Sequence, residues 1–389
     1  MNSNFTTTNF IRNVSIISEN YGFKNRSEYE KIRELYVEEP VINEFITDNL
    51  NFEYEEKLVK DGINFFYTNK LNYLEKPIFT YCLDKNIGTN ELVVAYHIYN
   101  VSSSIAEAML IQCLCSIIKD LGDSQYYLRI NSLGDKESKA KFKKELLNYF
   151  KKKIDILPPT ARELMKHSVE KTFLYLVENK HELIYGAPNP LEYLSDASRK
   201  HFRDIIEFLE MSGISYEIDS NMIDTSCYSE VLFKFEIEEY YKNRNYPHVV
   251  ITGGRIEACE DDLSNENSSI VSATLVLKDR KAPNKFAKPR YKTPCIYLAH
   301  LGFGPKVRTL LLLEELRCAG INVYHNVAYD SVTRQLREAE KKKCSYIVII
   351  GQKEYVEGSV ILRDKKIENQ ETISQKKLLS KLKRLNKKK

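Results

Sequence analysis

The stretch Tyr126–Asp135, which reads Y-Y-L-R-I-N-S-L-G-D, indicates the fold more clearly than any other part of the sequence. Its first half alternates, with Leu128 and Ile130 on one face and polar or aromatic side chains on the other, as in a strand that buries one side. Its second half supplies Asn, Ser, Gly and Asp, which favour a tight turn. A lysine-rich helical segment follows at once. We therefore expect this stretch to join a sheet to a helical insertion.

The composition is that of a globular protein with two or three domains, since the 389 residues are 43% hydrophobic and 29% charged. The formal net charge of +4 is small but unevenly placed. No acidic residue follows Glu371, and Gln375–Lys389 holds eight Lys or Arg residues. No segment resembles a signal peptide, and no run approaches the roughly 18 apolar residues of a membrane span. We expect a cytoplasmic protein with no membrane partner.

Cysteine, histidine and glycine usage argues against two common kinds of site. The eight cysteines form no CxxC pair, and the seven histidines never fall at ligand spacing with them. We therefore expect free thiols in a reducing compartment and no metal site. Glycine is sparse, at 14 residues, and neither GxxxxGK[ST] nor GxGxxG occurs. A glycine-rich nucleotide loop is not expected.

The segments on either side of the opening stretch predict a mixed sheet with helices. Pro77–Leu83 and Leu92–Val101 favour an antiparallel hairpin, and a helix follows that ends at Lys119. Lys136–Lys153 predicts an amphipathic helix that begins a helical insertion at about 136–200. Further strands are expected at Gly213–Ile218, Val231–Glu239 and Pro247–Thr252. The segment Thr252-Gly-Gly-Arg255 reads as a turn.

The basic, proline-containing segment Lys278–Pro294 is the best domain boundary. Strands and helices of similar length alternate beyond it, which predicts a small α/β domain with a largely parallel sheet. We divide the chain into a core at 1–290, an α/β domain at 291–374 and a basic tail at 375–389.

Four features together resemble a class II aminoacyl-tRNA synthetase of the histidine type, over nearly the whole chain. They are the stretch Leu128–Asp135, the helix that contains Glu107, the segment Thr252–Glu257, which is similar to the family's G-G-R-Y-D, and a C-terminal region containing Gln335–Ala339 and Tyr346–Gly351. The resemblance implies an α+β fold. It consists of an antiparallel core with a helical insertion and a C-terminal α/β anticodon-binding-like domain. It also implies a homodimer.

The family's chemistry is the ATP-dependent adenylation of histidine, followed by transfer to tRNA, and it uses arginines to offset charge on phosphorus. This sequence departs from that pattern consistently. No arginine occurs between Glu34 and Leu128, and Phe79-Thr-Tyr-Cys82 stands where the family has F-R-H-E. Asp224–Ser229 replaces R-G-L-D-Y-Y, and Ser272–Lys278 lacks the G-L-E-R pattern. A substrate loop with threonine and arginine, expected near residues 65–75, is also missing.

Removing one such donor typically costs about 3–4 kcal/mol of transition-state stabilisation, so the loss of several predicts a disabled enzyme. We therefore assign no catalytic residue and no cofactor. ATP and magnesium enter only if the chain is a divergent but active histidine–tRNA ligase, which is the alternative. A further alternative is a regulatory subunit, similar to the synthetase-derived activator of histidine biosynthesis.

Two sets of residues are candidates for binding. The first is a vestigial ligand pocket made of Glu107, Gly253, Gly254 and Arg255. Arg255 contacts a ligand in this interpretation and fixes a turn in the competing one, and Glu107 is otherwise a solvated or capping residue. The second set is RNA-binding and comprises Arg334, Gln335, Lys377, Lys381, Lys383, Arg384 and Lys387.

Other polar residues have plainer interpretations. His97 lies in an apolar run and is expected to be a hydrogen-bonded core residue. Asp224 and Cys227 invite a nucleophilic role, but Cys227 is better interpreted as a small buried residue. The lysines of Lys136–Lys153 either face RNA or are simply solvated. The leading hypothesis is a synthetase-like scaffold that binds tRNA, another RNA or a protein partner.

Overall fold

The computed structural model describes residues 7–29, 54–74, 76–86, 89, 91–120, 126–223, 228–237, 248–256, 269–281 and 296–387. Its larger sheet has eight strands in the order β1-β2-β3-β8-β7-β6-β4-β5. All neighbouring pairs are antiparallel except β1 with β2 and β4 with β5, which are parallel. The strands are β1 (Lys24–Asn25), β2 (Ile78–Lys85), β3 (Glu91–Tyr99), β4 (Tyr126–Gly134), β5 (Tyr216–Ile218), β6 (Tyr228–Ile237), β7 (His248–Ile256) and β8 (Ile270–Lys281).

Helices cover both faces of this sheet because its central strands are apolar on both sides. On β3, Val94, Tyr96 and Ile98 belong to the main core, with side chains from α1 (Thr7–Asn20), α4 (Ile105–Asp120) and α8 (Asp196–Met211). The alternate β3 residues Val93 and Ala95 face α3 (Tyr54–Thr68) on the other side. The predicted β2–β3 hairpin and the helix after it are confirmed.

The opening stretch forms β4 and the start of α5 (Lys136–Lys152), as predicted. Leu128 and Ile130 are fully buried, and Asp135 caps α5 by accepting a 2.9 Å hydrogen bond from the Ser138 backbone N–H. The Ser195 hydroxyl donates to the other oxygen of Asp135 at 2.6 Å, which ties this turn to the start of α8. The stretch thus joins the sheet to the insertion.

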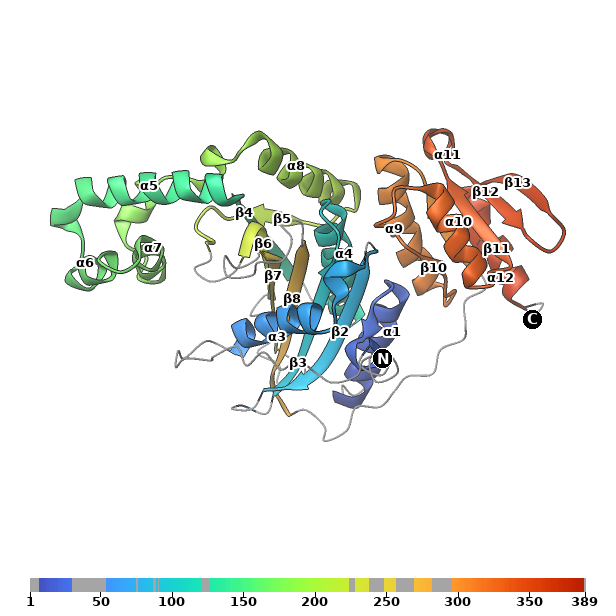
Figure 1. Ribbon diagram of the computed structural model, residues 1–389, viewed down its shortest axis with the longest axis horizontal. Coiled ribbons are helices and arrows are strands. Elements are labelled where there is room, and N and C mark those ends of the chain that lie inside the picture. Colours follow the sequence, from blue (N-terminus) through green and yellow to red (C-terminus); the bar gives the residue numbers. More distant parts are fainter. Residues whose placement is uncertain are drawn as a thin grey trace.

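The insertion projects from one side of the sheet (Figure 1). It contains α5, α6 (Pro159–Met165) and α7 (Val169–Glu178), with short 3-10 turns at Ile154–Ile156, Glu182–Gly186 and Pro190–Tyr193. Phenylalanines and leucines of α5 and α7 form a second apolar cluster, separate from the main core. The insertion is therefore held together by its own small core.

Two predictions about the middle of the chain are wrong. Thr252–Arg255 is not a turn but the interior of β7, paired with β6 and β8 on its two sides. Gly253 and Gly254 allow close packing there rather than a reversal of the chain, since a Cβ on Gly254 would lie 2.5 Å from the Val231 carbonyl oxygen. In addition, the first residues of the predicted linker, 278–281, belong to β8. The rest of that linker, 282–294, lies outside the described residues.

The C-terminal region forms a five-stranded sheet in the order β10-β9-β11-β12-β13. The prediction of a largely parallel sheet is wrong: β10, β9 and β11 are parallel, whereas β12 and β13 are antiparallel. The elements are β9 (Ile296–His300), α9 (Phe303–Cys318), β10 (Tyr324–His325), α10 (Val332–Lys341), β11 (Tyr346–Ile350), α11 (Gln352–Glu357), β12 (Ser359–Asp364), β13 (Asn369–Ser374) and α12 (Gln375–Lys387). In Figure 1 this region lies beside α4 and α1, with α9 nearest to them.

The basic tail is folded rather than extended. Gln375–Lys387 forms α12, in which Leu378 and Leu382 are fully buried against the C-terminal sheet. No helix among the described residues is long and apolar enough to cross a membrane. Five cysteines lie in the described part of the chain and form no disulfide, in agreement with the prediction of reduced thiols: Cys82, Cys113, Cys115, Cys318 and Cys344.

Candidate functional site

Glu107 and Arg255 form a buried ion pair that links α4 to β7. Arg255 Nε donates to Glu107 Oε1 at 2.7 Å, and Arg255 Nη2 donates to Glu107 Oε2 at 2.8 Å. The Glu107 side chain is fully buried, and the Arg255 side chain is 8% exposed. His201 of α8 approaches from a third element, with its Nε2 2.9 Å from Glu107 Oε1. Three elements of the core thus meet at one carboxylate.

The surroundings keep Glu107 ionised. Burial by itself raises the pKa of Glu107, but the Arg255 guanidinium and His201 outweigh it and hold the pKa at about 2. Both carboxylate oxygens accept hydrogen bonds, so the charge is fully compensated. The expectation that Glu107 is a solvated or capping residue is therefore wrong.

Arg255 has no hydrogen-bonding capacity left for a ligand. A guanidinium carries five N–H donors. Two of them bind Glu107, and the remaining three bind the Val101 carbonyl at 2.9 Å, the Ser103 carbonyl at 3.2 Å and the Ser269 hydroxyl. Of the four predicted pocket residues, Glu107 and Arg255 are in direct contact. The polar pair among them is saturated by protein groups, and the two glycines are packed inside β7.

The family resemblance calls for ATP-binding arginines in two segments, Phe79–Cys82 and Ser272–Lys278. Side chains of both segments meet on the face of the larger sheet that α3 covers. Thr80 of β2 is 1% exposed, and its neighbour Cys82 packs against an apolar cluster. That cluster joins Val276 of β8 to Leu58 of α3, together with Val93 and Ala95 of β3. The only basic residue in Ser272–Lys278 is Lys278, whose Nζ lies 3.7 Å from Glu91. Apolar side chains from three elements thus pack together in this region, beside the buried polar side chains of Thr80 and Thr274.

His97 lies on the same face and is buried in the core, as predicted, but its Nε2 finds no hydrogen-bond partner among the described residues. Its side chain is buried under α3, and the room for it exists because position 62 is glycine: a Cβ there would lie 1.9 Å from His97 Nε2. Burial lowers the pKa of His97 to about 3, so the ring is neutral at physiological pH. Asp224 and Cys227, the other candidates for chemistry, lie outside the described residues.

The predicted RNA-binding residues do not form one surface. Gln335 is fully buried, and its side-chain amide binds the backbone N–H of His300 at 3.0 Å and the carbonyls of His300 and Tyr329 at 2.9 and 3.1 Å. It fixes α10 to the end of β9 and is not available to RNA. Arg334 is exposed on α10, but α10 packs on the opposite face of the sheet from α12.

The remaining RNA candidates gather on α12. Lys377, Lys383 and Arg384 are exposed, whereas Lys381 is half-buried and paired with Glu371. Leu378 and Leu382 anchor the opposite side of the helix in the domain core. The basic residues are therefore held on a fixed helical surface. Lys387 belongs to the last turn of this helix, and its side chain is outside the described set.

Comparison with known proteins supports the resemblance in both parts of the chain. Residues 309–385 match the family model of the anticodon binding domain. The histidine–tRNA ligase of Chloroherpeton thalassium is 26% identical over 289 residues, which cover 71% of this chain and 65% of that protein. The ligase of Pelodictyon phaeoclathratiforme is 28% identical over 284 residues, covering 70% and 64%. These matches support a histidyl-tRNA synthetase-like class II family for this chain.

This chain spans a little under two thirds of the length of the curated histidine–tRNA ligases that it matches. A crystal structure of apo histidyl-tRNA synthetase from S. aureus aligns with 98% of this chain and 99% of its own, with a TM-score of 0.48 at 15% identity. Among the described residues, no group of three or more His, Cys, Asp or Glu side chains is placed to hold a metal ion.

Sequence reasoning missed several residues of this histidyl-tRNA synthetase-like core. His201 carries no local signal, because its partner Glu107 lies 94 positions earlier in the chain. Leu58 lies in a segment of weak periodicity, so its place over β3 and β8 could not be predicted. Ser269 is separated from Val101, whose carbonyl accepts its 2.8 Å hydrogen bond, by 168 positions. All three depend on long-range packing.

Proposed function

We propose that this histidyl-tRNA synthetase-like protein no longer adenylates histidine and acts as a scaffold that binds RNA through its C-terminal domain. One observation carries the proposal. The two segments in which the family resemblance requires nucleotide-binding arginines meet in an apolar cluster of Leu58, Val93, Ala95 and Val276 instead. Phosphoryl chemistry depends on preorganised positive groups in such a place, and these hydrocarbon side chains supply none. The arginine beside them, Arg26, donates to the Asp61 carbonyl of α3 at 3.0 Å and lies over the Phe65 ring.

The Glu107–Arg255 pair supports the same conclusion. A ligand that used Arg255 would have to displace protein partners from a guanidinium whose five donors are already satisfied. Breaking a buried pair of this kind typically costs about 3–5 kcal/mol, which is a large part of the binding energy of a small metabolite. We infer that the pair stabilises the core and does not receive a substrate.

The RNA role rests on α12 and the matched anticodon-binding family. Lys377, Lys383 and Arg384 are exposed on one anchored helix, and Glu371 is the last acidic residue before it. Cations held on a rigid element favour phosphate binding, since little side-chain or backbone order has to be gained on association. We propose tRNA or another structured RNA as the partner.

Salt-dependent binding of bulk tRNA tests this proposal. The triple variant Lys377→Ala, Lys383→Ala, Arg384→Ala should flatten the slope of log K against log salt concentration by roughly 2–3. These point variants are preferable to deleting 376–389, because a deletion would also remove the buried Leu378 and Leu382.

The matched control removes the same charge from the insertion, with Lys144→Ala, Lys151→Ala and Lys152→Ala on α5, where all three lysines are exposed. The proposal requires tRNA binding that is weakened by the α12 variant and unchanged by the α5 control. Binding weakened only by the α5 control would move the RNA surface to the insertion. No salt-sensitive tRNA binding at all would leave a protein partner as the better candidate and contradict the RNA role.

A second candidate is an active histidine–tRNA ligase, because the curated relatives bear that name. In that case ATP and magnesium would bind, and the apolar cluster under α3 would have to open. We also propose a homodimer, on the basis of the family resemblance.

A further inference from the structure

Glu314 of α9 connects the C-terminal domain to two helical elements of the core. Its Oε2 accepts two hydrogen bonds, one of 3.0 Å from the hydroxyl of Tyr21 and one of 2.9 Å from the hydroxyl of Ser116. Tyr21 is the residue directly after α1, and Ser116 lies in α4. The two hydroxyls are themselves 2.9 Å apart. One carboxylate oxygen thus joins residues that are 293 and 198 positions away in the sequence.

This junction is buried and its charge is compensated. Tyr21 and Ser116 are fully buried, and only 18% of the Glu314 side chain is exposed. Burial and the neighbouring Glu314 raise the pKa of Tyr21 well above its usual range, so its hydroxyl stays protonated and donates. Arg317, one turn along α9, binds both oxygens of Glu314 at 2.7 and 2.8 Å.

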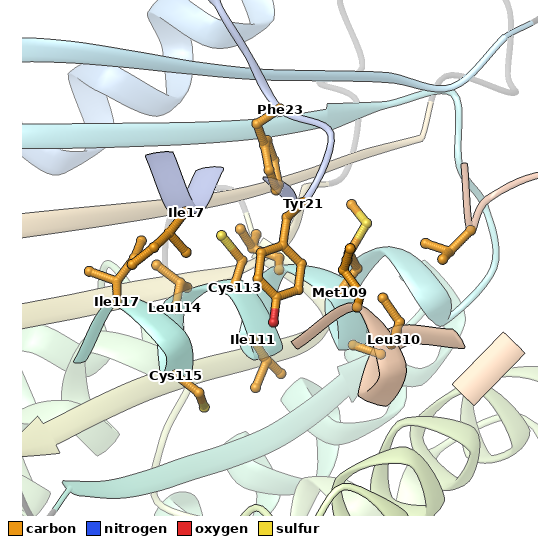
Figure 2. Close-up of a cluster of buried hydrophobic side chains, with 14 of the residues drawn as sticks. Ile17, Tyr21, Phe23, Met109, Ile111, Cys113, Leu114, Cys115, Ile117 and Leu310 are labelled. Carbon is orange, nitrogen blue, oxygen red and sulfur yellow. The ribbon is translucent and has the colours of Figure 1, made fainter. Parts of the chain in front are cut away.

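Apolar contacts surround these hydrogen bonds. Figure 2 shows the Tyr21 ring pointing toward α4, with Leu310 of α9 close to Met109 of α4. All three residues belong to one apolar cluster that extends from the eight-stranded sheet into the C-terminal sheet. The C-terminal domain therefore shares a core with the synthetase-like part, whereas the insertion has its own.

Two contacts at the edges extend the junction. Arg317 also lies 3.8 Å from Asp120 at the end of α4. His325 of β10 is buried, and its Nε2 lies 3.0 Å from the carbonyl oxygen of Asn20 at the end of α1. The core and the C-terminal domain thus interact through polar groups at three separate points, as expected of a specific and fixed contact rather than a loose one.

We propose that α1 and α4 form a docking platform that holds the C-terminal domain in one orientation, with Glu314 as the polar centre of the contact. The role of the core in this chain is then mechanical: it positions the domain that carries α12. This inference goes beyond the proposed function and does not depend on RNA binding.

Hydrogen exchange and small-angle X-ray scattering on the full chain test the proposal. Glu314→Ala removes the polar centre, and Tyr21→Phe removes one hydroxyl with its ring retained, which keeps the test valid if the first variant folds poorly. Glu315→Ala is the matched control, since Glu315 is the next residue of α9, is 53% exposed and forms an ion pair with Arg308 of its own helix at 2.9 Å.

A lost hydrogen bond to a charged group corresponds to roughly a tenfold change in an equilibrium constant. We expect exchange in α1 and α9 to become about tenfold faster in Tyr21→Phe and faster still in Glu314→Ala. The radius of gyration of Glu314→Ala should rise, whereas Glu315→Ala should match the parent chain. Unchanged exchange in both junction variants, or an equal effect of Glu315→Ala, would overturn the docking platform. Because RNA is absent from these measurements, their failure is distinct from a failure of RNA binding.

Discussion

Replacing Arg255 by methionine should strongly destabilise the core. The change removes the 2.7 and 2.8 Å hydrogen bonds to Glu107 and leaves a fully buried carboxylate with His201 as its remaining side-chain partner. Breaking a buried pair in this way costs about 3–5 kcal/mol. Since typical domains have about 5–15 kcal/mol of stability in total, the loss should be easy to measure by urea denaturation.

Two further variants show whether the cost arises from the unpaired carboxylate. Arg129→Met removes a guanidinium that is 38% exposed and pairs with surface acids, so it should cost under about 1 kcal/mol. The double variant Arg255→Met, Glu107→Leu should be more stable than the sum of its single changes by about 2–3 kcal/mol, because it removes the orphaned charge.

The same stability in Arg255→Met as in Arg129→Met would refute this reasoning. Additivity between the changes at positions 107 and 255 would refute it as well. Arg255 would then have no structural role, and ligand binding by the Glu107–Arg255 pair would again be the better interpretation.

Three other predictions follow from the core and its assembly. The pKa of Glu107 lies at about 2 in the folded chain against an ordinary value of 4.5, so the stability from its ionisation is present above pH ~4.5 and is lost as pH falls towards 2. Acid titration followed by circular dichroism should show a loss of about 3 kcal/mol over that window, and Glu107→Gln should abolish this pH dependence. Gly254→Ala should cost about 1–3 kcal/mol in urea denaturation, because its Cβ would lie 2.5 Å from the Val231 carbonyl oxygen in the neighbouring strand; a neutral effect would contradict the close packing of β6 on β7. Light scattering coupled to size-exclusion chromatography should give a homodimer, and a monomer at micromolar concentration would count against the family-based expectation.

Local patterns were sufficient to predict the elements that carry their own sequence signals. The β2–β3 hairpin has turn residues between two apolar runs, and β4 alternates before a turn whose aspartate caps α5. Such signals lie within about ten residues of the element that they define. The element can therefore be predicted without knowledge of its tertiary packing.

Errors arose where distant packing overrides local chemistry. The two glycines of Thr252–Arg255 are typical of a turn, but the neighbouring β6 and β8 leave room only for glycine in a strand. The sequence alone sets the lysine-rich tail apart from the α/β domain, yet the leucines at positions 378 and 382 are spaced to bury one side of a helix in the core of that domain. Gln335 is polar and in a helix, and only the position of β9 reveals that it is buried.

The candidate pocket was partly predictable. The family resemblance placed Glu107 and Arg255 together, but no local pattern indicated that they bind each other and His201. Whether an arginine is free or saturated depends on acceptors such as Val101 and Ser103, which are about 150 residues away.

Histidine-dependent exchange between ATP and pyrophosphate tests the central claim most directly. The segments Phe79–Cys82 and Ser272–Leu277 lack the family's nucleotide-binding arginines, and this predicts no exchange above background at saturating histidine, ATP and magnesium. The fold of the chain is verified by circular dichroism. An active histidyl-tRNA synthetase assayed in parallel provides the positive control. Clear histidine-dependent exchange by this chain would contradict the loss of adenylation and establish it as a working ligase.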